Sequence, residues 1–122
     1  MALAFDVVSV DKGNRNFTKL GIITFSGNYA TGGDTLNLTA ATSNDRIEGF
    51  QFRRNPIAGK LAKGDSGGYA YELIKGSGLT NWLLKVYEQD AGGALAQIAA
   101  AGYPAGVTDN DADFYIEFTE KA

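Results

Sequence analysis

Apolar and polar residues alternate along much of this chain, and alternation with a period of two is typical of strands that bury one face. The alternation is clearest in the segments that begin at Phe17, Ile47, Gly68, Trp82 and Phe114, and the second of these ends at Arg54. A weaker alternation over residues 5–10 and a turn at residues 11–14 predict an opening hairpin with the strand that follows. These segments predict a mainly β domain, either an antiparallel β-sandwich or a jelly-roll-like barrel, with at most one short helix.

Each alternating segment has one apolar face, and the residues on these faces should form the core. We expect the following side chains to be largely buried: Phe50, Phe52, Leu84, Val86, Phe114, Ile116 and Phe118. The Leu- and Ala-rich residues 36–41 predict a single helical turn, and residues 91–106 predict irregular structure with a short strand. Residues 56–67 hold Gly, Lys and Pro with few apolar anchors, which predicts an exposed loop.

Composition and charge narrow the function classes. The 122 residues are enough for one domain, residues 1–122, whose core needs no disulfide, and the chain contains no cysteine. The net charge of −3 argues against a nucleic-acid-binding protein, because tracking phosphates needs a basic face. Residues 1–6 lack the cationic start of a signal peptide, and no apolar run approaches the roughly 20 residues that span a membrane. We therefore expect a protein that is made in the cytoplasm and binds neither nucleic acid nor membrane.

Two motifs are typical of a catalytic site and of a metal-binding site, and neither motif is complete. Residues 64–68 match the nucleophile segment of chymotrypsin-like proteases, but the chain has no histidine to take the proton of Ser66. Residues 109–113 and Glu120 imitate the spacing of a calcium-binding EF-hand loop, but the position that needs Gly holds Phe114. We expect no enzymatic activity and assign no catalytic, cofactor-binding or metal-binding residues.

The segment from Ile23 to Asp34 begins as a strand and then breaks into a turn rich in Gly and Asn around Tyr29. It resembles the F-S-x-x-Y-x-T-G-G-(D/E) segment of the head-decoration (cement) proteins of tailed bacteriophages. Later segments follow the order of the same family, at residues 45–52, 68–73, 81–87 and 113–119. The resemblance covers residues 17–120, and the connections at 53–67 and 91–112 are longer than the family pattern.

The resemblance implies a structural virion protein without catalytic function. Such a protein binds the outer surface of a phage capsid at subunit junctions, stabilises the mature head, and is located on the virion after synthesis in the host cytoplasm. Its partner would be the major capsid protein, and the family suggests a homotrimer. A second hypothesis is a virion-surface binding module for glycans or for host-surface adhesion, and an enzyme is the least favoured class.

Four residues are candidates for a capsid or subunit interface: Tyr29, Asp34, Arg53 and Arg54. We expect Tyr29 to anchor the 26–35 loop, with its ring buried and its hydroxyl in water, and this loop to border an interface. Arg53 and Arg54, with Lys60 and Lys63, form the clearest local cluster of positive charge. This cluster is either a solvated loop or a docking patch for an acidic neighbour.

Overall fold

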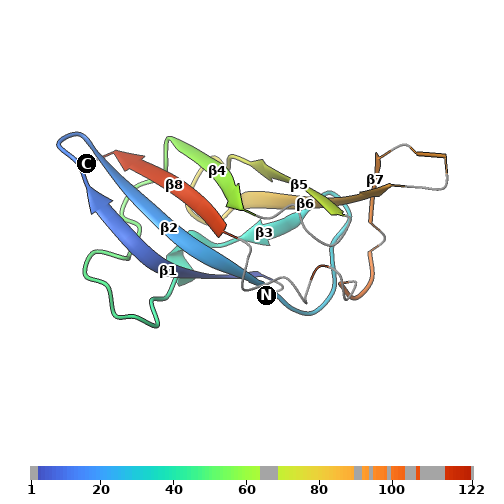
Figure 1. The fold of residues 1–122 in the computed structure, drawn as a ribbon, viewed down its shortest axis with the longest axis horizontal. Helices are drawn as coiled ribbons and strands as arrows, with labels where there is room; N and C mark the ends of the chain where they lie inside the picture. Colours follow the sequence, from blue (N-terminus) through green and yellow to red (C-terminus); the bar gives the residue numbers. More distant parts are fainter. Residues whose placement is uncertain are drawn as a thin grey trace.

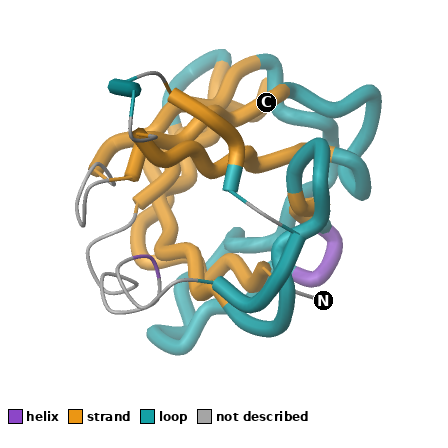
Figure 2. Tube along the Cα trace, turned by 90° about the vertical axis from the view of Figure 1, so that its right-hand side faces the viewer, coloured by secondary structure: helices purple, strands orange, loops and turns teal. Residues whose placement is uncertain are grey.

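The chain folds into two antiparallel β-sheets that pack face to face (Figure 1). A computed structural model describes residues 3–63, 69–89, 92–93, 95–98, 100–103, 107 and 115–121. Figure 2 views the sandwich from one end, with the strands around the core and the loops on the outside. The predicted mainly β fold is confirmed.

The first sheet has the strand order β1-β2-β8-β4. Its strands are β1 (Leu3–Lys12), β2 (Asn16–Phe25), β8 (Tyr115–Lys121) and β4 (Ala58–Lys63). The predicted opening hairpin is confirmed, because β1 and β2 pair antiparallel from Leu3 opposite Phe25 to Lys12 opposite Phe17. The register of this hairpin shifts by one residue between Val7 and Ser9, which marks a β-bulge.

The second sheet has the order β3-β6-β5, and β7 also pairs with β6. Its strands are β3 (Asp34–Leu36), β6 (Trp82–Gln89), β5 (Tyr69–Ile74) and β7 (Leu95–Gln97). A 3₁₀ turn, η1 (Leu38–Ala40), follows β3, as the Leu- and Ala-rich residues predicted. The short strand predicted within residues 91–106 is confirmed by β7.

The core lies between the sheets and is built around the ring of Phe118. Its centroid lies 5.2 Å from the ring of Phe5, 5.5 Å from Phe52 and 5.1 Å from Trp82, each in an edge-to-face arrangement. Gly59 in β4 makes this packing possible, because a Cβ there would lie 2.9 Å from the rings of both Phe118 and Trp82. Both sheets and their connections therefore meet at one aromatic cluster.

The core prediction holds for five of the seven side chains. Phe52, Leu84, Val86, Ile116 and Phe118 are buried, each at most 7% exposed. Phe50 is only half-buried and packs against the edge of the core. Phe114 lies outside the described residues.

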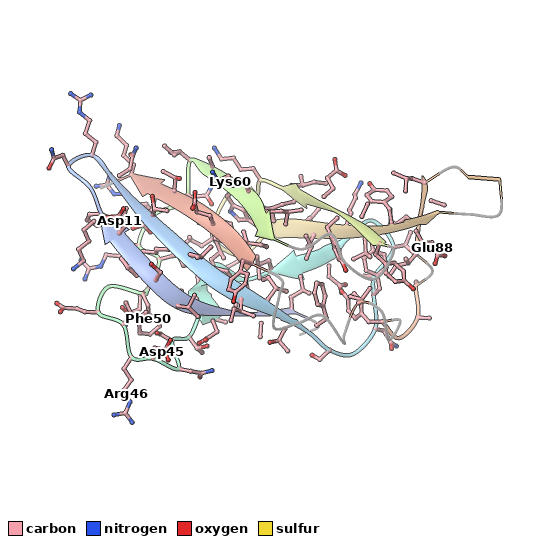
Figure 3. All side chains as sticks on the ribbon, in the orientation of Figure 1. Asp11, Asp45, Arg46, Phe50, Lys60 and Glu88 are labelled. Atoms are coloured by element: carbon pink, nitrogen blue, oxygen red, sulfur yellow. The ribbon has the colours of Figure 1, made fainter. Side chains whose placement is uncertain are left out.

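The strand predicted for residues 47–54 is wrong. The segment instead runs as turns and bends, and Arg46 and Gly49 have φ angles of 55° and 81°, which strands do not adopt. Side chains of the first sheet also bind its backbone, through the carbonyl of Gln51 and the N–H groups of Arg53 and Arg54. Figure 3 shows Asp45 and Arg46 pointing away from the sandwich at the tip of this excursion.

The exposed loop predicted for residues 56–67 is also wrong over part of its length. Residues 58–63 form β4, which pairs with β8 from Ala58 opposite Thr119 to Lys63 opposite Tyr115. Pro56 is buried, and the N–H of Ile57 donates to the carbonyl of Thr119 at 2.8 Å. The small and basic residues of β4 suit an edge strand, and the pattern had few large apolar residues to reveal it.

Truncation of the central ring should destabilise the whole sandwich. We expect Phe118→Ala to lower the free energy of unfolding by about 3–5 kcal/mol, because it leaves a cavity among three other rings. Ile57→Ala is the control, since Ile57 is 49% exposed, and should change the stability by no more than about 0.5 kcal/mol. Urea unfolding followed by tryptophan fluorescence measures both, and equal stability of the two variants would contradict the assignment of the core.

Candidate functional site

The loop after β2 is anchored from within by Tyr29. Its side chain is 1% exposed, and its backbone N–H donates to the carbonyl of Ala101 at 2.7 Å. The prediction that Tyr29 anchors the loop is confirmed. The prediction that its hydroxyl stays in water is wrong, because this oxygen is buried and accepts a hydrogen bond from the N–H of Val86 at 3.3 Å. The side chain of Tyr29 therefore extends from the loop to the backbone in the middle of β6.

Asp34 closes the same loop from its other end. The carboxylate is 5% exposed and accepts hydrogen bonds from the N–H of Ala30, at 2.9 Å, and from the hydroxyl of Tyr103. The ring of Tyr103 lies 5.9 Å from that of Tyr29 and 5.1 Å from that of Phe25. Two of the predicted interface residues, Tyr29 and Asp34, thus belong to one internal network, so any partner of this loop would contact the residues around them.

The tyrosines of this network resist ionisation. Burial raises the pKa of Tyr103 well above its usual range, and the hydrogen bond to the Asp34 carboxylate raises it further. Burial also raises the pKa of Tyr29, and this effect is opposed in part by the hydrogen bond from Val86. Both hydroxyls are therefore neutral hydrogen-bonding groups at physiological pH.

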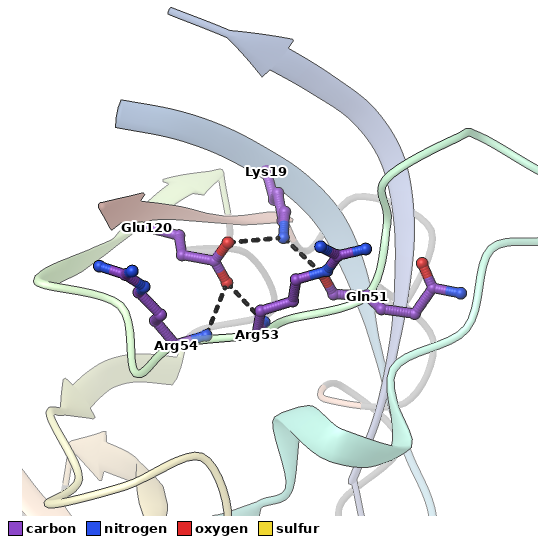
Figure 4. Close-up of polar contacts among 5 residues, drawn as sticks. All are labelled: Lys19, Gln51, Arg53, Arg54 and Glu120. Carbon is purple, nitrogen blue, oxygen red and sulfur yellow. Dashed lines mark hydrogen bonds and ion pairs between the residues drawn. The ribbon is translucent and has the colours of Figure 1, made fainter. Parts of the chain in front are cut away.

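A buried ion pair lies near the other end of β2 (Figure 4). Lys19 and Glu120 lie on the inner faces of β2 and β8, at 1% and 3% exposure, and Lys19 Nζ is 3.2 Å from Glu120 Oε1. The same Nζ donates to the carbonyl of Gln51 at 2.6 Å and lies 4.6 Å from the ring centroid of Phe52. The ammonium is therefore held on three sides, which offsets the cost of removing it from water.

The second oxygen of Glu120 holds the 53–54 segment in place. Glu120 Oε2 accepts hydrogen bonds from the backbone N–H groups of Arg53, at 2.9 Å, and Arg54, at 3.3 Å. Both arginine side chains are exposed, and Figure 4 shows them extending to opposite sides of the segment. One buried carboxylate thus fixes the position from which two cations project.

A cavity of about 330 Å³ opens beside the ion pair. Five charged side chains and three other residues line it: Lys12, Lys19, Arg53, Glu48, Glu120, Phe17, Gly49 and Gln51. Within the described part of the chain, the side chains of Lys12 and Arg53 have no hydrogen-bond or ion-pair partner. The cavity therefore offers two cationic groups that have no partner among the described residues.

The four predicted interface residues do not form one site. Arg53 and Arg54 lie with Glu120 beside the start of β2, whereas Tyr29 and Asp34 lie beyond its end. From Lys19 to Phe25 the strand alone spans about 20 Å, at about 3.3 Å per residue. Lys60 and Lys63, the other members of the predicted cluster, belong to β4, and Lys60 forms an exposed ion pair with Glu117 at 3.4 Å. The cluster is thus divided between two surfaces.

Sequence reasoning missed the pairing of Lys19 with Glu120, although the pattern carried a signal for both. Lys19 shares the parity of Ile23 and Phe25, and Glu120 shares the parity of Ile116 and Phe118. Each of the two strands has a single charged residue on its apolar face. This pattern would have predicted a buried ion pair if the two strands had been known to be neighbours.

The motifs that were considered for chemistry, residues 64–68 and 109–113, lie outside the described residues. Elsewhere, the described residues contain no group of three or more acidic, histidine or cysteine side chains that could hold a metal ion. The same part of the chain contains no helix that is long and apolar enough to cross a membrane.

Comparison with known proteins gives no assignment. No protein-family model, no curated protein and no solved structure matches this chain.

The buried ion pair should behave as a coupled unit. We expect Lys19→Met to cost about 3–5 kcal/mol of stability, because it leaves the Glu120 carboxylate buried without a counter-charge. The double variant Lys19→Met/Glu120→Gln should be more stable than Lys19→Met, since a glutamine oxygen can still accept from Arg53 and Arg54 while carrying no charge. A double-mutant cycle by urea unfolding tests this expectation, and additive losses would contradict it.

Ionisation of Tyr103 should destabilise the fold in alkali. An unfolded tyrosine ionises near pH 10, whereas the folded pKa is higher, so its stabilising contribution is complete below about pH 10 and is lost as the pH rises further. Tyr103→Phe should therefore show a shallower fall of stability between about pH 9.5 and 11.5 than the parent protein. Urea midpoints across this range provide the measurement, and identical slopes would show that Tyr103 does not contribute.

Proposed function

We propose that this protein is a structural virion protein that binds the outer surface of a phage capsid at subunit junctions and stabilises the mature head. It acts as a homotrimer, with the major capsid protein as its partner. Such a protein performs no chemistry. A partner that binds only the assembled shell stabilises that shell, and many copies on one lattice multiply a small gain per copy.

The observation that carries the proposal is the segment from Phe25 to Asp34. Five of the seven residues that define its resemblance to the decoration family have a structural role in this fold. Phe25 and Tyr29 are buried, Gly32 and Gly33 adopt φ angles of 95° and 110°, and Asp34 accepts the hydrogen bonds that close the loop. These roles support the view that the segment is a built connection between the two sheets, of the kind that the resemblance implies.

The charge distribution adds support for a docking function. Arg53 and Arg54 are exposed and projected from a rigid base, although the chain as a whole carries a net charge of −3. Charge complementarity of this kind guides encounter and orientation more than it adds affinity. An acidic surface on the capsid would be the complementary partner.

The alternative is a virion-surface module that binds glycans or a host surface. One observation favours it, since the half-buried Tyr87 and the exposed Glu72 lie together on the second sheet, with the tyrosine hydroxyl donating to the carboxylate at 2.9 Å. A ring beside a carboxylate can stack on a sugar and bind its hydroxyl groups.

Binding to undecorated heads separates the two functions. We expect the purified protein to co-sediment with mature heads of its own phage in a saturable way and to raise the temperature at which they release DNA. Sedimentation equilibrium should show a trimer.

A Tyr87→Ala/Glu72→Gln variant should decorate heads as well as the parent protein does. The proposal fails if the protein does not co-sediment with heads but binds glycans saturably and loses that binding in this variant.

A further inference from the structure

The end of the sandwich that holds the Lys19–Glu120 pair is rich in exposed positive charge. Five exposed cations surround it: Lys12, Arg15, Arg53, Arg54 and Lys121. The pairing brings them together, because Lys12 lies opposite Phe17, Lys121 lies opposite Asn16, and Glu120 binds the backbone of both arginines. Among these five, Lys12 and Arg53 line the cavity.

A β-bulge decides which residue of β1 faces this cavity. Val7 lies opposite Gly21, but Ser9 lies opposite Leu20, so one extra residue has entered β1 between them. Without the extra residue, the register would place Asp11 opposite Phe17; with it, Lys12 takes that place. The bulge therefore presents a cation to the cavity and turns the neighbouring carboxylate of Asp11, labelled in Figure 3, to the other face.

The charge of the cavity suits one monovalent anion. Lys19 and Glu120 neutralise each other at 3.2 Å. Of the remaining lining groups, Lys12 and Arg53 are cationic and Glu48 is anionic, which leaves one net positive charge. A carboxylate matches that charge, whereas a phosphate monoester, with close to two negative charges, would exceed it.

The size and walls of the cavity suit a carboxylate on an aliphatic stem. Its volume of about 330 Å³ is many times the roughly 30 Å³ that one water occupies in the liquid. The ring of Phe17 supplies an apolar wall, and the exposed Arg53 also lines the cavity. An arginine fork can bind both oxygens of a carboxylate at once.

We propose that this cavity receives the side chain of a glutamate or aspartate from a protein partner, held between Lys12 and Arg53. The identity of that partner rests on the proposed function, in which it is an acidic residue on the capsid surface. The Lys19–Glu120 pair acts as the fixed floor of the site, because Lys19 binds the carbonyl of Gln51 and Glu120 binds the backbone N–H of Arg53. Arg54 extends to the opposite side and takes no part in the cavity.

The first experiment needs no capsid and uses a fluorescein-labelled hexaglutamate peptide at low salt. Fluorescence anisotropy should show saturable binding that weakens by about fivefold in Lys12→Gln and in Arg53→Gln. Arg54→Gln is the matched control, because it removes the same charge from the adjacent residue, and its affinity should stay within about twofold. Backbone amide signals of Gly49 and Gln51 should shift on binding.

Three results would overturn the site. One is equal weakening in Arg53→Gln and Arg54→Gln, which would indicate a diffuse charge effect. The second is unchanged affinity in a Lys12→Gln/Arg53→Gln double variant that melts at the parental temperature. The third is tighter binding of a single-stranded oligonucleotide than of the peptide at the same ionic strength, which would indicate a phosphate site.

A second experiment separates this inference from the proposed function. Lys12→Gln/Arg53→Gln should co-sediment with heads at least tenfold more weakly than Arg54→Gln does. If the parent protein does not bind heads but binds the peptide through Lys12 and Arg53, the capsid function fails and the carboxylate site stands. If the double variant binds heads as tightly as the parent does, the carboxylate site fails and the capsid function stands.

Discussion

The burial of one ion pair organises the basic end of this molecule. Lys19 and Glu120 sit on the inner faces of adjacent strands, where an unpaired charge would be costly, so each requires the other. Lys19 also donates a hydrogen bond to the carbonyl of Gln51, and Glu120 accepts hydrogen bonds from the N–H groups of Arg53 and Arg54. A segment without secondary structure is thereby fixed to the end of the first sheet, and the cavity beside it depends on that attachment.

Different interactions hold the segments at the two ends of the sandwich in place. At the far end, Tyr29, Tyr103 and Asp34 form an internal network of ring contacts and hydrogen bonds, which fixes the 26–35 loop from within. At the near end, closure is ionic and leaves cations projecting outward. Between them, the ring of Phe118 joins both sheets. The loop end is therefore suited to holding shape, and the ionic end to meeting a charged partner.

The proposed function would use this difference between the two ends of the sandwich to strengthen a capsid. A decoration protein needs a rigid body and a surface whose contacts form only with the assembled partner. A cation whose backbone is already fixed loses only side-chain freedom on binding, which preserves more of the interaction as affinity. The ion pair that fixes Arg53 and Arg54 supplies such a base, and the bulge in β1 places Lys12 at the same cavity as Arg53.

Local pattern alone determined the strands with one apolar face: the hairpin of β1 and β2, β6 with Trp82, Leu84 and Val86 inward, and β8. It also indicated Tyr29 as an anchor, because a lone aromatic in a Gly-rich turn has few other roles.

Only the tertiary structure decided the rest. Residues 47–54 alternate like a strand, but Lys19 and Glu120 bind their backbone groups from strands distant in sequence. Residues 58–63 look like a loop, yet β8 supplies the hydrogen bonds that make them a strand. Whether a backbone group bonds a neighbouring strand or a side chain depends on contacts about 30 to 70 residues away in sequence, which periodicity does not encode.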